Sequence, residues 1–430
     1  MNSKKFLAFT MAAAMTLSLA ACGGNGGGAG SSGGSSASGS TGDTSTGGVT
    51  AGTTVKEVVD PTGAAFKIGA TGPLTGDASI YGLAAYRGAQ IAVNEINSEG
   101  GDIQFELNYQ DDQNVPETAV NAYNNLKDWG MQISLGSVTT QPGIATSQYN
   151  FEDRIFALTP SASSPDVIAN KDNVFQMCFS DPNQGLASAQ YIYEQNLGEN
   201  VYIIWKNDDV YSTGIKDQFV AEAEELGLNI VGDSTFTEDT KNDFTVQLTD
   251  AQQKGADLVF LPMYYQPASL ILTQADSMGY EPKFFGVDGM DGILTMEGFD
   301  ASLAEGVMLL TPFNADATDD ATVAFVTEYE SLYGETPNQF AADGYDCIYA
   351  LTLALEAAGC TPDMSAQDIN DALIVAFSGE YDDAGELVTP GITLTGLTGD
   401  GEGITWDSTG AVSKAPKGMV IENGAYVGMD

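Results

Sequence analysis

The stretch Asp257–Val287, DLVFLPMYYQPASLILTQADSMGYEPKFFGV, decides the fold because it contains a complete strand–helix–strand unit. It begins with the short apolar run DLVFLP and ends with a second one, KFFGV, and both are typical of buried strands. Between them the pattern predicts a helix near 267–279 that stops at a glycine. Two short strands separated by a helix of this length predict a parallel pair in one sheet.

The same alternation of strand and helix runs through most of the chain. Further strands are predicted at FKIGATG, IQFELNY, MQISLG, IFAL, VYIIW, LNIVG and GVMLLT. Further helices are predicted after Tyr81, from Pro116, from Pro142, and near 183–196, 212–226, 243–254, 319–333, 340–357 and 367–377. These strands are too many for one sheet of ordinary size. The sequence therefore predicts an α/β protein with two doubly wound parallel-sheet lobes, and ligands bind such sheets beyond the carboxyl ends of their strands.

The length and charge of the chain favour several folded lobes and exclude some classes of partner. A chain of 430 residues is too long for one ordinary core and favours more than one folded lobe. Its formal net charge of −44 opposes nucleic acid and anionic lipid, so we expect no nucleic-acid partner. The acidity does not identify a ligand, because a solvated surface explains it equally well.

The sequence contains no histidine, which argues against catalysis. Ser-His-Asp and Cys-His arrangements and histidine-containing metal sites are therefore excluded. The sequence also carries no Walker loop and no G-x-S-x-G elbow. We expect a protein that is not an enzyme, with no catalytic residue, no metal and no cofactor.

The four cysteines are Cys22, Cys178, Cys347 and Cys360. No two of them have the C-x-x-C spacing of a zinc or redox site. The last three are predicted to be small buried apolar residues, although the sequence leaves open a disulfide between two of them.

The N-terminus, MNSKKFLAFTMAAAMTLSLAACGG, has two lysines followed by an apolar run that is short for a membrane span. Residues 1–21 are therefore predicted to be a secretory signal peptide. The segment LAAC, ending at Cys22, resembles the lipobox of bacterial lipoproteins and implies cleavage before Cys22 and acylation of its thiol. The alternative is an ordinary signal peptide with an unrelated cysteine. With lipidation at Cys22, the mature protein would be extracytoplasmic and lipid-anchored to the cell membrane.

Residues 22–62 are predicted to form a flexible tether rich in glycine and serine. Such a composition cannot bury enough apolar surface to offset its ordering entropy. A tether on a lipid anchor would hold a folded domain near the membrane while leaving it free to turn.

Two loops rich in small hydroxyl residues follow neighbouring predicted strands. They are SLGSVTTQPG (Ser134–Gly143) and TPSASSPDV (Thr159–Val167). Hydroxyl and backbone N–H groups at two adjacent strand ends form a cradle for an anion. Because neither loop contains Lys or Arg, a carboxylate fits better than a phosphate. The alternative is that these residues only cap the helices that follow.

Five stretches in combination carry a resemblance to a known family. They are KIGATGPLTGDASIYGLAAYRGAQIAVNEINSEGG, GSVTTQPGIATSQYNFEDRIFALTPSASSPDV, NDDVYSTGI, DFTVQLTDAQQKGADLVFLPMYYQPASLILTQADSMG and ITWDSTGAV. From about Lys67 to Val427 the chain resembles bacterial branched-chain amino acid binding proteins, the leucine/isoleucine/valine-binding type of periplasmic-binding-protein fold I. This resemblance implies two lobes joined by three crossings, near 181, 313 and 398. The implied lobes are 63–181 with 314–397 (N-terminal) and 182–313 with 398–430 (C-terminal).

The resemblance also implies binding residues for a zwitterion on the N-terminal lobe. Ser137 corresponds to the serine that binds the ligand carboxylate through its hydroxyl and backbone N–H. Ser163 stands where the family usually has threonine, and its hydroxyl would contact carboxylate and ammonium. The backbone of Ser161 and Ala162 would help to hold the zwitterion.

On the C-terminal lobe, the resemblance places Asp288 where a glutamate often pairs with the ammonium, with Asp291 of the same VDGMDG segment as the alternative. Tyr81 of the N-terminal lobe, with Tyr211 and Tyr264, would line the pocket or close over it, although tyrosines in such a pattern are also typical of a core. Tyr265 is expected to point elsewhere. We expect Ser137 and Asp288 to lie on opposite lobes.

The implied function is that of a monomeric solute-binding lipoprotein of an ABC importer. It would capture a zwitterionic amino acid, with a branched-chain aliphatic side chain as the first expectation, and deliver it to the permease and its ATPase. A sensor domain for a signalling receptor and an enzyme on a doubly wound fold are the alternatives. The sequence leaves the identity of the amino acid open.

Overall fold

The computed structural model describes residues 55–382, 384–399 and 403–429. The signal peptide, Cys22 and most of the predicted tether therefore lie outside the described residues. All described residues belong to one compact unit, Gly47–Asp430.

The first of two large sheets contains five parallel strands in the order β2-β1-β3-β4-β5. The strands are β1 (Phe66–Gly72), β2 (Phe105–Asp111), β3 (Ile133–Leu135), β4 (Phe156–Thr159) and β5 (Val174–Gln176). This order is a doubly wound arrangement whose direction of winding reverses between β1 and β3.

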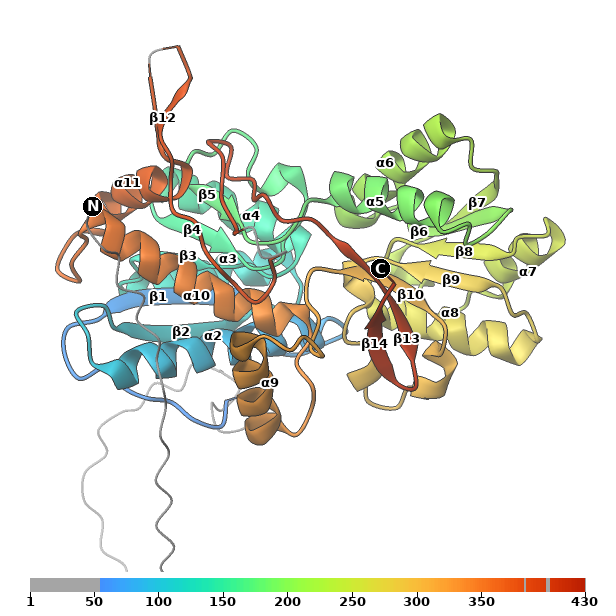
Figure 1. Ribbon diagram of the computed structural model, residues 1–430, viewed down its shortest axis with the longest axis horizontal. Coiled ribbons are helices and arrows are strands. Elements are labelled where there is room, and N and C mark those ends of the chain that lie inside the picture. The colour runs from blue at the N-terminus through green and yellow to red at the C-terminus, as the bar shows by residue number, and fades with distance from the viewer. Residues whose placement is uncertain (1–54, 383, 400–402, 430) are drawn as a thin grey trace, which may run out of the picture. The chain divides into compact units, whose positions relative to one another are not determined.

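Helices from both ends of the folded chain cover this sheet (Figure 1). They are α2 (Ser79–Glu99), α3 (Pro116–Trp129), α4 (Thr140–Asp153), α9 (Asp320–Tyr333), α10 (Gln339–Ala358) and α11 (Ala366–Ser378). Two glycines allow α2 and α10 to touch backbone to backbone, since a Cβ at Gly88 would fall 1.8 Å from the carbonyl oxygen of Ala341 and one at Gly344 would fall 2.2 Å from that of Ala85. The sheet and these helices are called the first lobe below.

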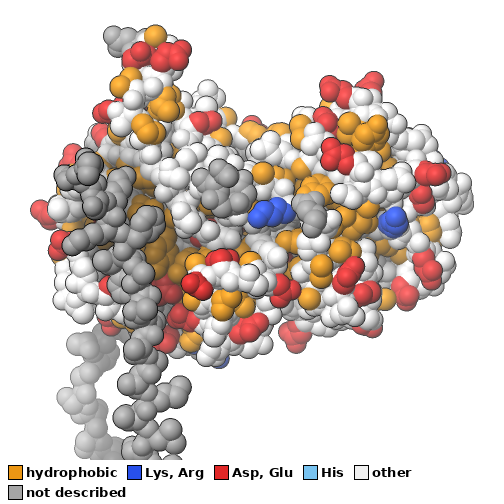
Figure 2. Space-filling model, viewed as in Figure 1, with side chains coloured by type: hydrophobic (Ala, Val, Ile, Leu, Met, Phe, Trp, Pro, Cys, Tyr) orange, Lys and Arg blue, Asp and Glu red, His pale blue; other side chains and the backbone are white. Residues whose placement is uncertain are grey.

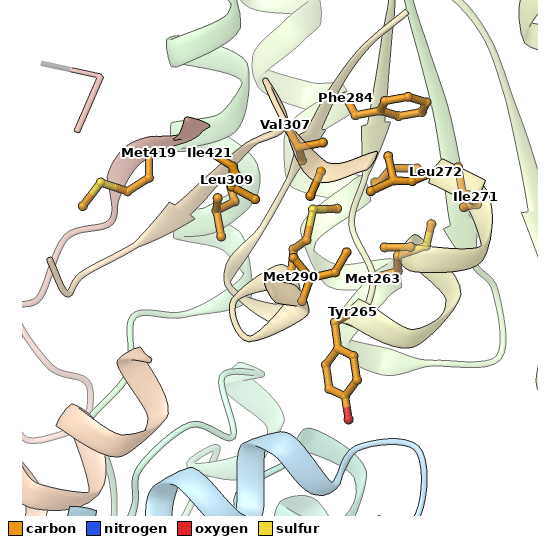
Figure 3. Close-up of a cluster of buried hydrophobic side chains, with 14 of the residues drawn as sticks. Met263, Tyr265, Ile271, Leu272, Phe284, Met290, Val307, Leu309, Met419 and Ile421 are labelled. Carbon is orange, nitrogen blue, oxygen red and sulfur yellow. The ribbon is translucent and has the colours of Figure 1, made fainter. Parts of the chain in front are cut away.

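The second sheet contains seven strands in the order β14-β13-β10-β9-β8-β6-β7. They are β6 (Val201–Lys206), β7 (Ile230–Phe236), β8 (Leu258–Leu261), β9 (Lys283–Gly286), β10 (Met308–Thr311), β13 (Lys417–Glu422) and β14 (Ala425–Gly428). Its helices are α5 (Asp181–Glu194), α6 (Val210–Leu226), α7 (Thr245–Gln253) and α8 (Tyr265–Met278). Met263, Leu272 and Leu309 belong to the buried cluster between this sheet and α8 (Figure 3). This sheet and its helices are called the second lobe.

The predicted α/β class with two doubly wound lobes is confirmed, but the second sheet is not wholly parallel. β13 runs antiparallel to β10, and β14 runs antiparallel to β13. A separate hairpin of β11 (Glu380–Tyr381) and β12 (Leu387–Thr389) projects from the first lobe (Figure 1). β5, β11, β12 and β14 were not predicted because they are short or exposed, and β13 was not predicted because its apolar run, Met419–Ile421, is only three residues long.

The chain passes between the two sheets three times. The first passage links β5 to α5 and the second links β10 to α9. The third lies later than the predicted position near 398, because the backbone N–H of Gln176 in β5 still bonds the carbonyl of Gly410 at 2.9 Å. The chain joins the second sheet only at β13, after a buried ion pair of 2.7 Å between Lys414 and Asp343 of α10.

The predicted tether extends too far in the C-terminal direction. Residues 55–61 dock on α2, where the backbone N–H of Val59 donates to Asn94 Oδ1 at 2.8 Å and its carbonyl accepts from Asn97 at 2.8 Å. Val55 is buried against Leu74 and Tyr86. Folded structure therefore begins at or before Val55 rather than at 63.

Cys178, Cys347 and Cys360 are buried and unpaired, which confirms their prediction as small apolar core residues. Among the described residues, no helix has the length and apolarity that a bilayer crossing demands. Figure 2 shows acidic side chains scattered over both lobes of the face in view, without one dominant acidic patch.

Candidate functional site: a cavity between the lobes

A small cavity lies where the carboxyl ends of strands from both sheets meet. It is lined by Tyr81, Val138, Thr139, Thr140, Ser161, Ser163, Tyr211, Tyr264, Asp288, Gly289 and Phe340. Most of these residues follow β3 and β4 in one sheet or β6, β8 and β9 in the other. The exceptions are Tyr81, on α2, and Phe340, on α10.

One wall of the cavity presents hydroxyl groups. Thr139, Thr140 and Ser163 are at most 4% exposed, and their hydroxyl oxygens have no hydrogen-bond partner within the described structure. Thr140 begins α4, a helix of 14 residues, so the positive end of its dipole faces the same wall. Buried unpaired hydroxyls are unfavourable, and a polar ligand would satisfy them, with an anionic group best placed at Thr139 and Thr140 beside the start of α4.

Ser137 does not join this wall. Its hydroxyl lies 2.7 Å from that of Thr71 and 3.3 Å from that of Thr146, and its carbonyl accepts a hydrogen bond of 2.6 Å from Thr159. Ser137 therefore braces the loop after β3, and Thr139 and Thr140 supply the hydroxyls at the cavity. The family resemblance did not predict this difference between Ser137 and the two threonines, because the turn after β3 decides which hydroxyl faces the cavity.

In the loop after β4, too, only some of the predicted residues reach the cavity. Ser161 and Ser163 line the cavity, whereas Ala162 is not on its wall. The N–H of Ala162 donates to Thr159 Oγ1 at 3.0 Å, and its carbonyl accepts from Gln176 at 2.6 Å. The backbone groups of Ala162 are thus used inside the loop rather than offered to a ligand.

Asp288 forms the opposite wall. It begins a 3-10 turn directly after β9, is 3% exposed, and accepts a hydrogen bond from the hydroxyl of Tyr211. Burial raises the pKa of its carboxyl to about 6, against the lowering effect of hydrogen bonds from Tyr211 and Gln184. An ammonium group in the cavity would favour the ionised carboxylate. Asp288 follows β9 and Ser137 follows β3, so they lie on opposite lobes as expected.

Asp291 has a different role from Asp288. Its carboxylate accepts from the backbone N–H of Gln339 at 2.9 Å and ties the loop after β9 to the start of α10. Burial raises the pKa of this carboxyl to about 6 as well, but Asp291 does not line the cavity. Of the two candidates in VDGMDG, the structure brings only Asp288 to the site.

The aromatic side chains close the cavity across the lobes. Tyr81 of α2 donates its hydroxyl to the carbonyl of Gly289 and accepts a hydrogen bond of 3.1 Å from the N–H of Tyr265. The ring of Tyr264 lies 5.2 Å from that of Tyr81 and 4.8 Å from that of Tyr211. The three predicted tyrosines therefore meet at the site.

Two further aromatic residues complete this arrangement. Phe340 also lines the cavity, with its ring 4.5 Å from that of Tyr81. Sequence reasoning missed Phe340, because it is an apolar residue in a helix that packs on the first lobe, where a core role is the natural expectation. Tyr265 is off the wall, and its hydroxyl accepts from the N–H of Ile80 at 3.4 Å, so it points toward α2 as expected (Figure 3).

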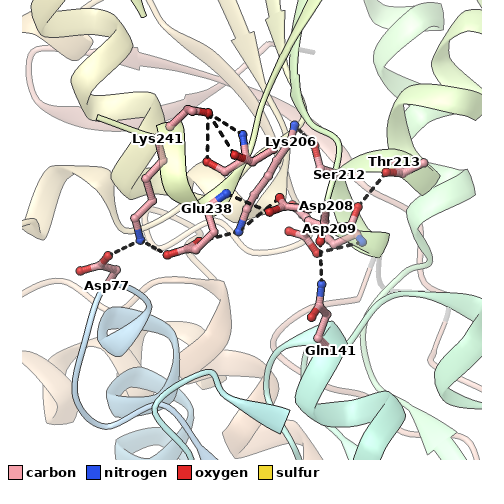
Figure 4. Close-up of polar contacts among 12 residues, drawn as sticks. Asp77, Gln141, Lys206, Asp208, Asp209, Ser212, Thr213, Glu238 and Lys241 are labelled. Atoms are coloured by element: carbon pink, nitrogen blue, oxygen red, sulfur yellow. Dashed lines mark hydrogen bonds and ion pairs between the residues drawn. The ribbon is translucent and has the colours of Figure 1, made fainter. Parts of the chain in front are cut away.

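Polar contacts also join the two lobes around a neighbouring pocket that shares Tyr264 with the cavity (Figure 4). Lys241 of the second lobe lies 2.7 Å from Asp77 beside α2 and also pairs with Glu238. Gln141 of α4 donates to the carbonyl of Asp208 at 3.1 Å. Together with the hydrogen bonds of Tyr81, these contacts hold the two lobes against each other.

Two facing α/β lobes around a polar cavity define the class of two-lobed solute-binding proteins. Residues 65–386, well over half of the chain, match the family model for periplasmic binding proteins. The chain therefore belongs to the periplasmic binding protein family, whose members are extracytoplasmic binding proteins.

Individual relatives agree with this assignment. A Leu/Ile/Val-binding protein homolog of Brucella melitensis is 27% identical over 303 residues, covering 70% of this chain and 81% of that protein. The crystal structure of the leucine-binding protein LivK from Thermotoga maritima has a TM-score of 0.73 and 25% identity, covering 85% of this chain and 98% of that chain. The branched-chain amino acid transporter substrate-binding protein LivJ from Streptococcus pneumoniae, solved with isoleucine, has a TM-score of 0.73 and 25% identity, covering 84% of this chain and 97% of that chain. The predicted resemblance to the Leu/Ile/Val-binding type is confirmed.

Proposed function

We propose that this protein is the substrate-binding component of an ABC importer and that it captures a free amino acid in the cavity between its lobes. The observation that carries the proposal is the polarity of the cavity. Three buried hydroxyls without partners in the described structure lie on one lobe, a buried carboxylate faces them from the other, and no Lys or Arg lines the wall. A zwitterion needs donors at its carboxylate and an acceptor at its ammonium.

The carboxylate of the ligand is assigned to Thr139 and Thr140, where the dipole of α4 adds a favourable field. The ammonium is assigned to Asp288. The rings of Tyr81, Tyr264 and Phe340 provide apolar walls, which suit a branched-chain aliphatic side chain. The ligands named for the relatives support an amino acid with such a side chain.

Transport requires a partner that recognises the closed protein. Contacts from both lobes to one ligand are complete only when the lobes are closed, so the ligand shifts the protein toward that form. We propose that an ABC permease with its ATPase accepts the closed form and that the binding protein acts as a monomer. A sensor domain for a signalling receptor would use the same cavity with a different partner, and the importer-type relatives favour transport.

Membrane attachment belongs to the same proposal. The LAAC segment supports lipidation at Cys22, and the Gly/Ser-rich segment after it supports a tether to the folded lobes. The acyl chains would keep the extracytoplasmic protein beside its permease.

Thermal unfolding with each of the twenty amino acids tests the proposed ligand class. The protein is first unfolded and refolded to remove any ligand that co-purifies. A ligand that binds only the folded state adds RT ln(1 + [L]/Kd) to its stability, so aliphatic amino acids should raise the unfolding midpoint most. Chromatography of the released ligand should recover it unchanged. Absence of any shift with all twenty, or consumption of the ligand in proportion to protein, would reject the proposal.

A further inference from the structure

Asp181 is tied by its backbone to Ser163, one of the residues that form the hydroxyl wall of the cavity. Asp181 is the first residue of α5 and is fully buried, and neither of its carboxylate oxygens has a hydrogen-bond partner within residues 55–382, 384–399 and 403–429. Burial raises the pKa of this carboxyl well above its usual value, and the nearby Asp288 and Asp209 add to the increase. A buried carboxylate without partners is strongly unfavourable, so its position calls for an explanation.

Two contacts hold Asp181 against Ser163. The backbone N–H of Asp181 donates to the carbonyl of Ser163 at 3.1 Å, which ties the start of α5 to the loop after β4. On the other side, a Cβ added to Gly214 of α6 would lie 3.3 Å from the Cβ of Asp181 and 3.4 Å from its Oδ2. The carboxyl group is thus confined between α6 and the Ser163 loop.

Ser163 connects Asp181 to the cavity. Its side chain lines the cavity, is 1% exposed, and has no completed hydrogen bond within the described structure. It nevertheless lies close enough to Asp181 to lower the pKa of that carboxyl. A serine hydroxyl has one proton to donate and two lone pairs that accept. If the proton turns toward Asp181, only lone pairs face the cavity.

We infer that Asp181 is a positioning residue that accepts a hydrogen bond from the hydroxyl of Ser163, so that Ser163 can only accept a hydrogen bond from the ligand. This inference rests on the proposed function and deepens it. Ser163 then contacts the ammonium together with Asp288, and the carboxylate is left to Thr139 and Thr140. A bound ammonium also favours the ionised form of Asp181, which has acceptors only, because opposite charges stabilise each other.

The consequence is a selection against molecules that lack the ammonium. A 2-hydroxy acid or a plain carboxylic acid keeps the carboxylate but offers no cation to Asp288 and at most one donor to Ser163. Rejection of such analogues by buried acceptors left unpaired is far stronger than rejection by shape alone. The site is therefore built for amino acids rather than for carboxylic acids in general.

The test compares two probes, L-leucine and 2-hydroxy-4-methylpentanoate, by calorimetry on the full folded chain. Asp181→Asn should lower the ratio of leucine affinity to hydroxy-acid affinity by about tenfold or more, because its amide can donate to Ser163 and turn the hydroxyl proton toward the cavity. Ser163→Ala should lower the same ratio. Asp166→Asn removes a neighbouring charge without touching Ser163 and should leave the ratio unchanged.

A double-mutant cycle separates positioning from simple charge attraction. In the Ser163→Ala background, Asp181→Asn should change the ratio no further. An equal loss in both backgrounds would overturn the inference, because Asp181 would then act on the ammonium through its charge. If wild type binds neither probe, the proposed function fails together with the inference. If wild type binds leucine and Asp181→Asn leaves the ratio unchanged, only the inference fails.

Gly214→Ala provides a second variant in case Asp181→Asn does not fold. The added methyl group presses on the carboxyl group of Asp181 and should displace it from Ser163. A smaller fall in the same ratio is expected, and a folded Gly214→Ala protein with the wild-type ratio would count against the inference.

Discussion

Asp288→Asn removes the negative charge of the cavity while keeping the shape of the side chain. At about 3 Å and an effective dielectric constant of about 20, a carboxylate and an ammonium attract by about 5 kcal/mol. Desolvation of both groups offsets part of this attraction because Asp288 is only 3% exposed. The net loss should be about 1.5–3 kcal/mol, the range for a hydrogen bond to a charged group, or about tenfold to a hundredfold in Kd. Calorimetry with L-leucine at constant pH measures it.

Asp291→Asn is the matched control for this prediction. Its amide oxygen can still accept the N–H of Gln339, so the loop after β9 should keep its place and affinity should change by less than about threefold. If Asp291→Asn weakens binding and Asp288→Asn does not, the ammonium site has been assigned to the wrong aspartate.

Four further outcomes are expected. Ligand affinity should fall about tenfold from pH 7.5 to pH 5 in titration calorimetry, because the ligand binds ionised Asp288 and that form is lost as pH falls through its pKa of about 6; a flat profile would contradict this. Lys241→Gln and Asp77→Asn should each weaken ligand binding by at most about fivefold at low salt and have little effect at 1 M salt, since Asp77 is 61% exposed and salt screens the pair. Gly88→Ala should cost about 1–3 kcal/mol in the free energy of unfolding measured with urea, because α2 and α10 must separate to admit the methyl group. Cys22→Ala should abolish acylation in mass spectrometry of the mature protein, and an unmodified wild-type N-terminus would refute the lipoprotein assignment.

Much of the fold was predictable because its signals are local. The apolar runs of β6, β8 and β9 are buried on both faces, and the glycine after α8 ends that helix in the left-handed conformation. The third passage was placed too early because residues 404–412 are held to β5 by single hydrogen bonds, while the isolated bridges nearby pair residues 394–412 with one another. Such pairing leaves no periodic pattern in the sequence.

The site was predictable only in part, for a geometric reason. Asp288 and the three tyrosines were predicted from the family resemblance, and the structure places all four on the cavity wall. Ser137 was assigned to the ligand, yet its hydroxyl turns inward to Thr71. Nothing in the sequence indicated that Asp181 lies beside Ser163, because a loop and the strand β5 separate the two residues along the chain. An aspartate in the first turn of a helix is ordinarily explained by its favourable interaction with the helix dipole.

The hydrogen bonds of Tyr81 to Gly289 and Tyr265 bear on how fast a captured molecule can leave. They join backbone groups of one lobe to a side chain of the other and include no ligand atom, so they form in the closed protein whichever ligand it holds. Escape requires these bonds to break together with the ligand's own contacts to the two lobes, so lobe opening sets a minimum residence time even for a weakly bound ligand. A partner that separates Tyr81 from Gly289 would remove that minimum and speed the release of any captured amino acid.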